Sequence, residues 1–167
     1  DLYNKSVNEI EEIWHGLEFP YENLFQWLRN ETSKPKIDFK KLFHPMMLAN
    51  PIDEEKDFKR LNASEFQAEY KWDGIRVQLM VSSKSVSLYS RTGDNISSAF
   101  PEIVENTKGD AVIDGELLVG RNFEPSSFND LQQRLNRKKA SKDLQEKFPV
   151  FIRAYDILFY KGKDLRK

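Results

Sequence analysis

Residues 75–81 carry the pattern that most constrains what this chain can fold into. Apolar and more polar side chains alternate through this segment. Successive side chains of a β-strand point to opposite faces of a sheet, so the alternation predicts a strand with one buried face. The polar residues 82–85 are typical of a turn, and Val86 and Leu88 repeat the alternation. The segment therefore predicts an antiparallel hairpin.

The rest of the chain after residue 35 extends this hairpin into an α+β pattern. Further strands are expected at residues 66–71, 111–119 and 149–160. Helices are expected at residues 101–108, where Pro101 suits the first turn, and at 127–135 and 140–147. Strands joined by hairpins and interrupted by helices indicate an α+β fold with a mainly antiparallel sheet and flanking helices.

A short helical segment precedes the sheet. Apolar residues at spacings of three and four predict an amphipathic helix over residues 7–17, and a second helix is expected at 21–30. Residues 30–36 are polar and contain a proline, as linkers often do. We therefore expect a domain boundary there, with residues 1–34 and 35–167 in separate units.

Composition excludes several classes of site. The chain has no cysteine, which rules out disulfides, thiolate zinc sites and cysteine nucleophiles. Its two histidines, His15 and His44, show no metal-ligand spacing, and a Ser-His-Asp triad built on them is disfavoured. No apolar run approaches the ~20 residues that cross a bilayer. The formal net charge of −1 means that any nucleic-acid binding must come from local basic patches.

One short motif places a lysine between two carboxylates. It lies between the strands expected at 66–71 and 75–81, and reads Glu69-Tyr70-Lys71-Trp72-Asp73-Gly74. In an extended chain the side chains of Glu69, Lys71 and Asp73 would share one face. A cross-strand ion pair and an Asp-Gly turn would explain the same residues without chemistry. The motif alone therefore leaves both interpretations open.

Further motifs follow in a fixed order: Ser90-Arg91-Thr92-Gly93, Asp114-Gly115-Glu116 and Ala154-Tyr155-Asp156-Ile157-Leu158. With the lysine motif they resemble the covalent nucleotidyltransferase superfamily of DNA ligases, RNA ligases and capping enzymes. The flanking segment His44-Pro45-Met46-Met47-Leu48-Ala49, with residues 128–138, is most similar to bacterial ATP-dependent DNA ligases. The resemblance covers residues 44–167 and implies the N-terminal part of a nucleotidyltransferase (adenylation) domain, with an ATP-grasp-like ligase fold. Residues 1–34 would then be the tail of a helical DNA-binding domain.

The resemblance also implies a role for each matched residue. Lys71 would be the nucleophile that becomes adenylylated, and Asp73 would orient it or its leaving group. Arg76 and Arg91 would contact the ribose or phosphate of AMP and the 5′-phosphate of the nick. The other residues would bind ATP: Glu69 at the adenine amino group, Tyr155 stacked on the ring, Glu116 at the ribose hydroxyl or a metal, and Tyr70. Divalent metal, Mg²⁺ or Mn²⁺, would stabilise the departing pyrophosphate. Without any function, Tyr155 would be an ordinary core residue, and Arg91 and Glu116 would be ordinary surface charges.

The expected macromolecular partner is nicked duplex DNA, and no membrane is expected. Basic residues on and between the helices expected at 127–135 and 140–147 are candidates for phosphate contact or for a plain solvated face. They are Arg134, Arg137, Lys138 and Lys139, with Lys142 nearby. A cytoplasmic, bacterial protein that is monomeric at full length is expected.

The family pattern continues beyond the matched motifs. A second glutamate motif, a Lys-x-Lys motif and an OB-fold domain should follow residue 167. We therefore expect the 167-residue chain not to seal nicks alone. The alternatives are an RNA ligase, a capping-type nucleotidyltransferase, or a non-catalytic nucleotide- or DNA-binding module, which would have no need of the Lys71 amine.

Overall fold

The structure, a computed structural model, describes residues 3–14, 16–17, 19–37, 43–135, 137 and 139–166. The helices are α1 (Val7–Trp14), α2 (Glu22–Leu28), α3 (Glu54–Asp57), α4 (Pro101–Asn106), α5 (Phe128–Leu135) and α6 (Lys142–Lys147). The strands are β1 (Ile75–Val81), β2 (Val86–Ser90), β3 (Ala111–Arg121), β4 (Glu124–Pro125), β5 (Val150–Tyr160) and β6 (Lys163–Asp164). The expected α+β class is confirmed. None of the helices within the described ranges is long and apolar enough to cross a membrane.

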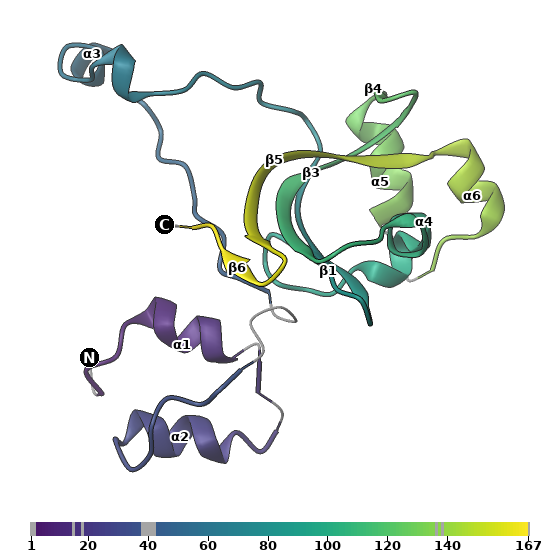
Figure 1. The fold of residues 1–167 in the computed structure, drawn as a ribbon. Helices are drawn as coiled ribbons and strands as arrows, with labels where there is room; N and C mark the ends of the chain where they lie inside the picture. The colour runs from purple at the N-terminus through teal and green to yellow at the C-terminus, as the bar shows by residue number, and fades with distance from the viewer. Residues whose placement is uncertain are drawn as a thin grey trace.

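A curled antiparallel sheet forms the body of the protein (Figure 1). Its strand order is β2-β1-β3-β5-β6, and β4 pairs separately with β3. The hairpin predicted from the alternating pattern is confirmed as β1 and β2, with Val81 opposite Val86. The long strands expected near residues 111 and 149 are confirmed as β3 and β5.

The two faces of the sheet have different chemistry. On one face Val77, Leu79, Leu117 and Val119 form the main core, and Leu131 of α5 packs into it. Charged side chains occupy the other face. There Arg76 on β1 lies opposite Glu116 on β3, which lies opposite Arg153 on β5. Directly opposed residues project to the same face, so the three form one row across the sheet.

Residues 43–47 cross this polar face and are held there through their backbone. The amide group of Gln78 accepts from the N–H of His44 (2.6 Å) and donates to its carbonyl (3.1 Å). The His44 ring stacks on Phe159 with centroids 4.8 Å apart. Arg76 donates to the carbonyl of Met47 (2.6 Å). These bonds satisfy buried polar groups and fix the path of the segment over the sheet.

The N-terminal helices have a small core of their own. Ile13 of α1 packs with Leu24, Trp27 and Leu28 of α2, and Ile37 joins them. Both helices are shorter than the segments expected at 7–17 and 21–30. An ion pair between Arg166 and Glu12, at 2.7 Å, links α1 to the chain after β6. His15 lies outside the described residues.

The strand expected at residues 66–71 is wrong. These residues are exposed and have no strand structure; they belong to a loop of residues 66–73, here called the Lys71 loop. Before this loop the chain runs away from the sheet to α3, and the loop brings it back, as Figure 1 shows. The neighbouring edge of β3 is already used beyond Leu117, because the N–H of Ser126 donates to Val119 (2.7 Å) and β4 pairs with Gly120. Residues 66–71 alternate as a strand would, but the edge of β3 with which they would pair is already occupied.

Candidate active site

The polar face of the sheet contains a cavity of about 900 Å³ beside the Lys71 loop. It brings together seven of the eight residues that the sequence assigned to catalysis or nucleotide binding: Glu69, Tyr70, Lys71, Arg76, Arg91, Glu116 and Tyr155. They come from the Lys71 loop, from β1, β3 and β5, and from the turn after β2. The eighth, Asp73, is not in the cavity wall; its charge acts on Glu116, which places it nearby.

Gly74 allows the Lys71 loop to approach β3 closely. A Cβ atom at this position would lie 2.4 Å from the carbonyl oxygen of Leu117 and 2.9 Å from Cγ of Glu116. Close backbone approach therefore explains this glycine, whereas the Asp-Gly turn considered from the sequence would have needed a positive φ. The Gly74 N–H donates to the Glu116 carboxylate. Burial raises the pKa of Glu116, and this bond and Arg76 oppose that effect only in part.

Arg76 is held in place by a buried carboxylate. Its Nη2 lies 2.6 Å from Oδ2 of Asp114, whose side chain is only 5% exposed. Its Nη1 donates to Met47, so the guanidinium bridges the sheet and the crossing segment. The sequence motif contains Asp114, but the sequence alone assigned it no role. Its pairing with Arg76 leaves Glu116 as the carboxylate of that motif in the cavity wall.

Tyr155 owes its position to an irregularity of the sheet. Asp114 pairs with Asp156 and Gly115 pairs with Ala154, so Tyr155 is an extra residue on β5. Such a β-bulge redirects side chains, and bulges are common beside active sites. The ring lies 5.9 Å from the guanidinium carbon of Arg76. Burial, strengthened by the charge of Asp114, raises the pKa of the hydroxyl to about 12.

Arg91 is presented by a tight turn after β2. The N–H of Gly93, at φ 86°, donates to Ser90 (3.0 Å), and the Thr92 hydroxyl donates to Asp94 (2.5 Å). A positive φ is readily adopted only by glycine, which explains the Thr-Gly pair. The turn places Arg91 in the wall of the cavity and also of a smaller one of about 330 Å³ toward α1.

Sequence reasoning assigned no role to one side of the cavity. Met47, Leu48, Ala49, Asn50 and Trp72 complete its wall. Met47 and Leu48 are largely exposed, although both are apolar. The run of apolar residues after His44 was the available signal, since exposed apolar groups often mark a binding surface.

The site offers few groups to a metal ion. Within the residues that the structure describes, no three acidic or histidine side chains gather closely enough to hold one. Glu116 provides one carboxylate in the cavity wall. This is compatible with Mg²⁺, which is usually bound by one or two carboxylates together with substrate phosphates.

The role of Arg134 in DNA contact, expected from the sequence, is wrong. Its side chain is fully buried and lies 2.7 Å from Glu102. It donates to the carbonyls of Phe148 (2.7 Å) and Ala99 (3.0 Å), and its guanidinium lies 5.3 Å from the Phe100 ring. The charge is buried where it pairs with Glu102 and donates to two backbone carbonyls, a pairing that the basic run did not reveal.

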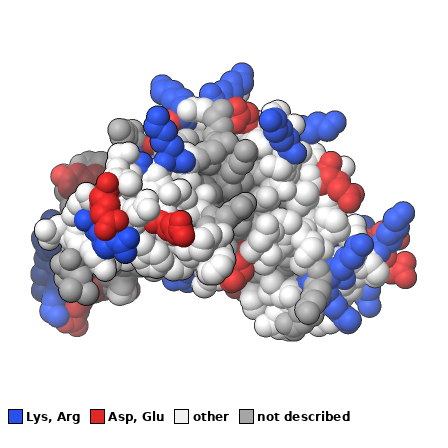
Figure 2. Space-filling view, turned by 90° about the horizontal axis from the view of Figure 1, so that it is seen from below, with Lys and Arg blue, Asp and Glu red and all other residues white. Residues whose placement is uncertain are grey.

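The other basic residues lie on the far side of the sheet from the cavity. Arg137 and Lys139 are exposed, and they follow α5, which packs on the core face. Lys138 lies outside the described residues. In Figure 2 the basic side chains stand in separate groups with acidic ones between them. DNA contact by Arg137 and Lys139 stays a prediction.

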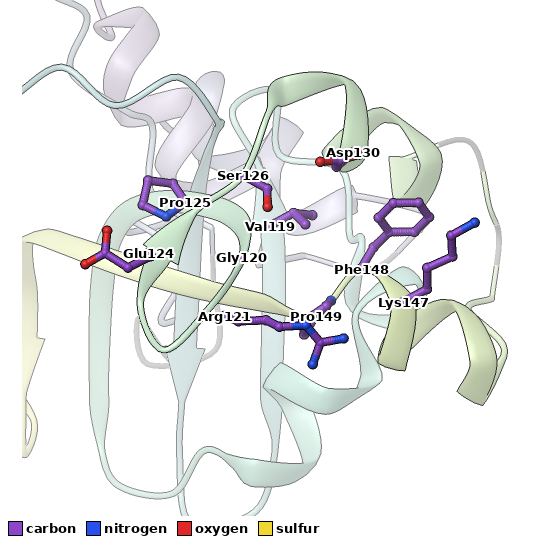
Figure 3. Close-up of a pocket in the computed structure, with 10 residues that line it drawn as sticks. All are labelled: Val119, Gly120, Arg121, Glu124, Pro125, Ser126, Asp130, Lys147, Phe148 and Pro149. Carbon is purple, nitrogen blue, oxygen red and sulfur yellow. The ribbon is translucent and has the colours of Figure 1, made fainter.

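A third cavity, also of about 330 Å³, lies at the C-terminal end of β3 (Figure 3). Arg121 from β3, Asp130 from α5 and Lys147 from α6 contribute to its wall. It contains none of the residues that the motifs single out. The chemistry is therefore assigned to the larger cavity beside Lys71.

A lysine, two arginines, an acid and an aromatic ring around one cavity define a site suited to nucleotides. The chain belongs to the ATP dependent DNA ligase domain family, whose model matches residues 46–167. A protein named probable DNA ligase from Koribacter versatilis (strain Ellin345) is 37% identical over 131 residues, which are 74% of this chain and 22% of that protein. A DNA ligase from Thermococcus fumicolans is 32% identical over 139 residues, or 80% of this chain and 25% of that one.

A protein of solved structure also has a similar sequence. The ligase domain of LigD from M. tuberculosis is 26% identical, with a TM-score of 0.46, over 58% of this chain and 30% of that one. The chain thus spans about a quarter of the length of the two curated relatives described above.

Proposed function

We propose that this chain is the part of an ATP-dependent DNA ligase that carries the nucleophile, and that Lys71 is the nucleophile. One observation supports this above all: Lys71, Tyr155 and two arginines line the same cavity. An aromatic ring stacks on a base, and guanidinium groups pair with phosphate oxygens, so the combination suits a nucleotide. The proposal includes the division into a helical unit, residues 1–34, and an adenylation unit, residues 35–167.

The proposed reaction begins with attack of the neutral Lys71 amine on the α-phosphorus of ATP. A P–N bond forms, the bond to the bridging oxygen breaks, and pyrophosphate leaves with the electron pair while the amine loses a proton to water. An oxygen of the 5′-phosphate at a nick then attacks the same phosphorus, and the amine leaves and regains a proton. Finally the 3′-hydroxyl attacks the activated 5′-phosphate, so that the strand is sealed and AMP is released.

The surrounding residues would bind and orient the nucleotide. Tyr155 would stack on adenine, and its hydroxyl stays protonated at neutral pH because its pKa is about 12. Glu69 would accept from the adenine amino group. Arg76, fixed by Asp114, is suited to a ribose or phosphate oxygen at a set position, since an ion pair of this kind removes its rotational freedom.

Three further roles complete the proposed site. Arg91 would pair with phosphate, Tyr70 would contact the nucleotide, and Asp73 would orient the Lys71 amine. Glu116 would bind the ribose hydroxyl or share a divalent metal ion with the phosphates. When bound, that ion would neutralise charge on the departing pyrophosphate. The DNA would be held by its phosphates, and Arg137 and Lys139 are the described candidates.

Labelling with α-labelled ATP and Mg²⁺ tests the proposal directly. The chain should gain one adenylyl group, seen by intact mass, and peptide mapping should place it on Lys71. Lys71→Arg keeps the charge but removes the nucleophile, so the label should disappear. Lys84→Arg, in the exposed turn between β1 and β2, is the matched control and should label normally. Label that persists in Lys71→Arg would place the nucleophile elsewhere.

The same experiment separates the alternatives. A capping-type enzyme would label with GTP, and an RNA ligase would pass the adenylyl group to a nicked RNA rather than to nicked DNA. A non-catalytic binding module would bind ATP without becoming labelled.

A further inference from the structure

Arg153, in the middle of β5, makes contacts that the proposed chemistry does not use. Its guanidinium carbon lies 4.1 Å from the centre of the Trp72 ring and 5.8 Å from that of Phe151. Its Nη2 donates to the carbonyl of Phe123 (2.8 Å). It lies in the same cross-sheet row as Arg76 and Glu116, yet it is not part of the cavity wall. The face of the Arg153 guanidinium therefore contacts the Trp72 ring, and one of its edges is bonded to the Phe123 carbonyl.

The partner of Arg153 is next to the nucleophile in the sequence. Trp72 follows Lys71 directly, in a loop that has no strand pairing within residues 66–72. Trp72 is half-buried, whereas residues 66–71 are exposed. Two contacts attach this stretch to the sheet: the stack of Trp72 on Arg153 and, two residues later, the bond from Gly74 to Glu116. The path of the Lys71 backbone depends on both.

We propose that Arg153 is a positioning residue for Lys71: it holds Trp72 against the sheet and so fixes how the amine enters the cavity. The inference rests on the proposed function. The Nε atom of Arg153 is buried and makes no hydrogen bond within the described residues. Arg153 is half-buried, and removing part of a cation from water is costly, so the stack on the Trp72 ring offsets part of that cost. A planar guanidinium is needed because its face stacks while its edge donates to Phe123; an ammonium cannot do both.

Fluorine NMR with 5-fluorotryptophan tests the contact without any need for catalysis. The chain has three tryptophans, and Trp14 and Trp27 belong to α1 and α2, away from Arg153. In Arg153→Ala the Trp72 signal should move, and its shift between H₂O and D₂O should reach that of an exposed indole. The other two signals should stay in place, and Lys147→Ala, which removes another cation beside an aromatic ring, should move none of the three.

Arg153→Lys covers the case in which the alanine variant does not fold, which would move all three signals. The lysine variant keeps the charge and the aliphatic stem, and should still release Trp72. An unchanged Trp72 signal in the variant that folds would overturn the proposal.

Kinetics then test the effect on Lys71. Arg153→Ala and Arg153→Lys should each slow lysyl-AMP formation at saturating ATP about tenfold, and the half-saturating ATP concentration should stay within about twofold. Trp72→Leu should give the same loss, and the double variant should be no slower, because the pair acts as a unit. A raised half-saturating concentration at an unchanged rate would instead make Arg153 a nucleotide contact and overturn the proposal. If the parent chain forms no adduct, the proposed function fails, while the Trp72 signal still decides the role of Arg153.

Discussion

Replacing Arg134 by alanine should destabilise the fold rather than weaken DNA binding. The side chain is fully buried, pairs with Glu102 and donates to the carbonyls of Ala99 and Phe148. Removing one partner of a buried ion pair costs about 3–5 kcal/mol. Because Glu102 is 20% exposed and can regain some water, the lower end, ~3 kcal/mol, is expected. For a chain of this size that corresponds to a fall in Tm of about 6–12 °C.

Urea and thermal unfolding measure this loss, and binding to nicked duplex provides the comparison. Arg134→Lys should lose less, because it keeps the charge but cannot reach both carbonyls. Arg137→Ala, at an exposed position three residues further along the chain, should change the unfolding free energy by less than ~0.5 kcal/mol. If Arg134→Ala unfolds like the parent chain while its DNA affinity falls, the argument from burial is refuted.

Three further predictions concern the cavity. Tyr155→Phe should leave ATP affinity nearly unchanged while Tyr155→Ala weakens it by ~1–3 kcal/mol by titration calorimetry; equal losses would mean that the hydroxyl, not the ring, matters. Gly74→Ala should cost more than ~2 kcal/mol of unfolding free energy, because its Cβ would lie 2.4 Å from a backbone oxygen of Leu117; a well-folded variant would show that β3 can shift. Burial raises the pKa of Glu116 in the folded state, so the folded protein binds this proton more tightly than the unfolded chain does. The contribution of Glu116 to the free energy of unfolding should therefore fall as the pH rises above its ordinary pKa of 4.5. Glu116→Gln should therefore gain stability relative to the parent as the pH rises through that region, and parallel pH profiles would contradict the shift.

Local patterns were sufficient where neighbours in sequence are neighbours in space. The alternation in residues 75–81 and the polar turn after it gave the β1–β2 hairpin, since both strands and their connection lie within sixteen residues. The motifs also identified most of the cavity wall, because each was recognised from its own few residues.

Contacts between distant segments were the part that the sequence did not reveal. Residues 66–71 alternate like a strand, but pairing depends on β3, where β4 and Ser126 occupy the edge. Arg134 looked like one member of a basic run, and its burial depends on carbonyls of segments 14 and 35 residues away. Arg153 interrupts an otherwise mostly apolar strand, which in retrospect was the signal for a half-buried cation.

Two backbone contacts help to anchor the segment over the polar face: Gln78 bonds to both backbone groups of His44, and Arg76 donates to the carbonyl of Met47. A residue recognised through its peptide group can change its side chain without losing its place. Met47, which is 83% exposed, is therefore a position in the cavity wall where the side chain can vary. A library varied at Met47 would reshape this side of the cavity while leaving the sheet, the arginine and the lysine where they are.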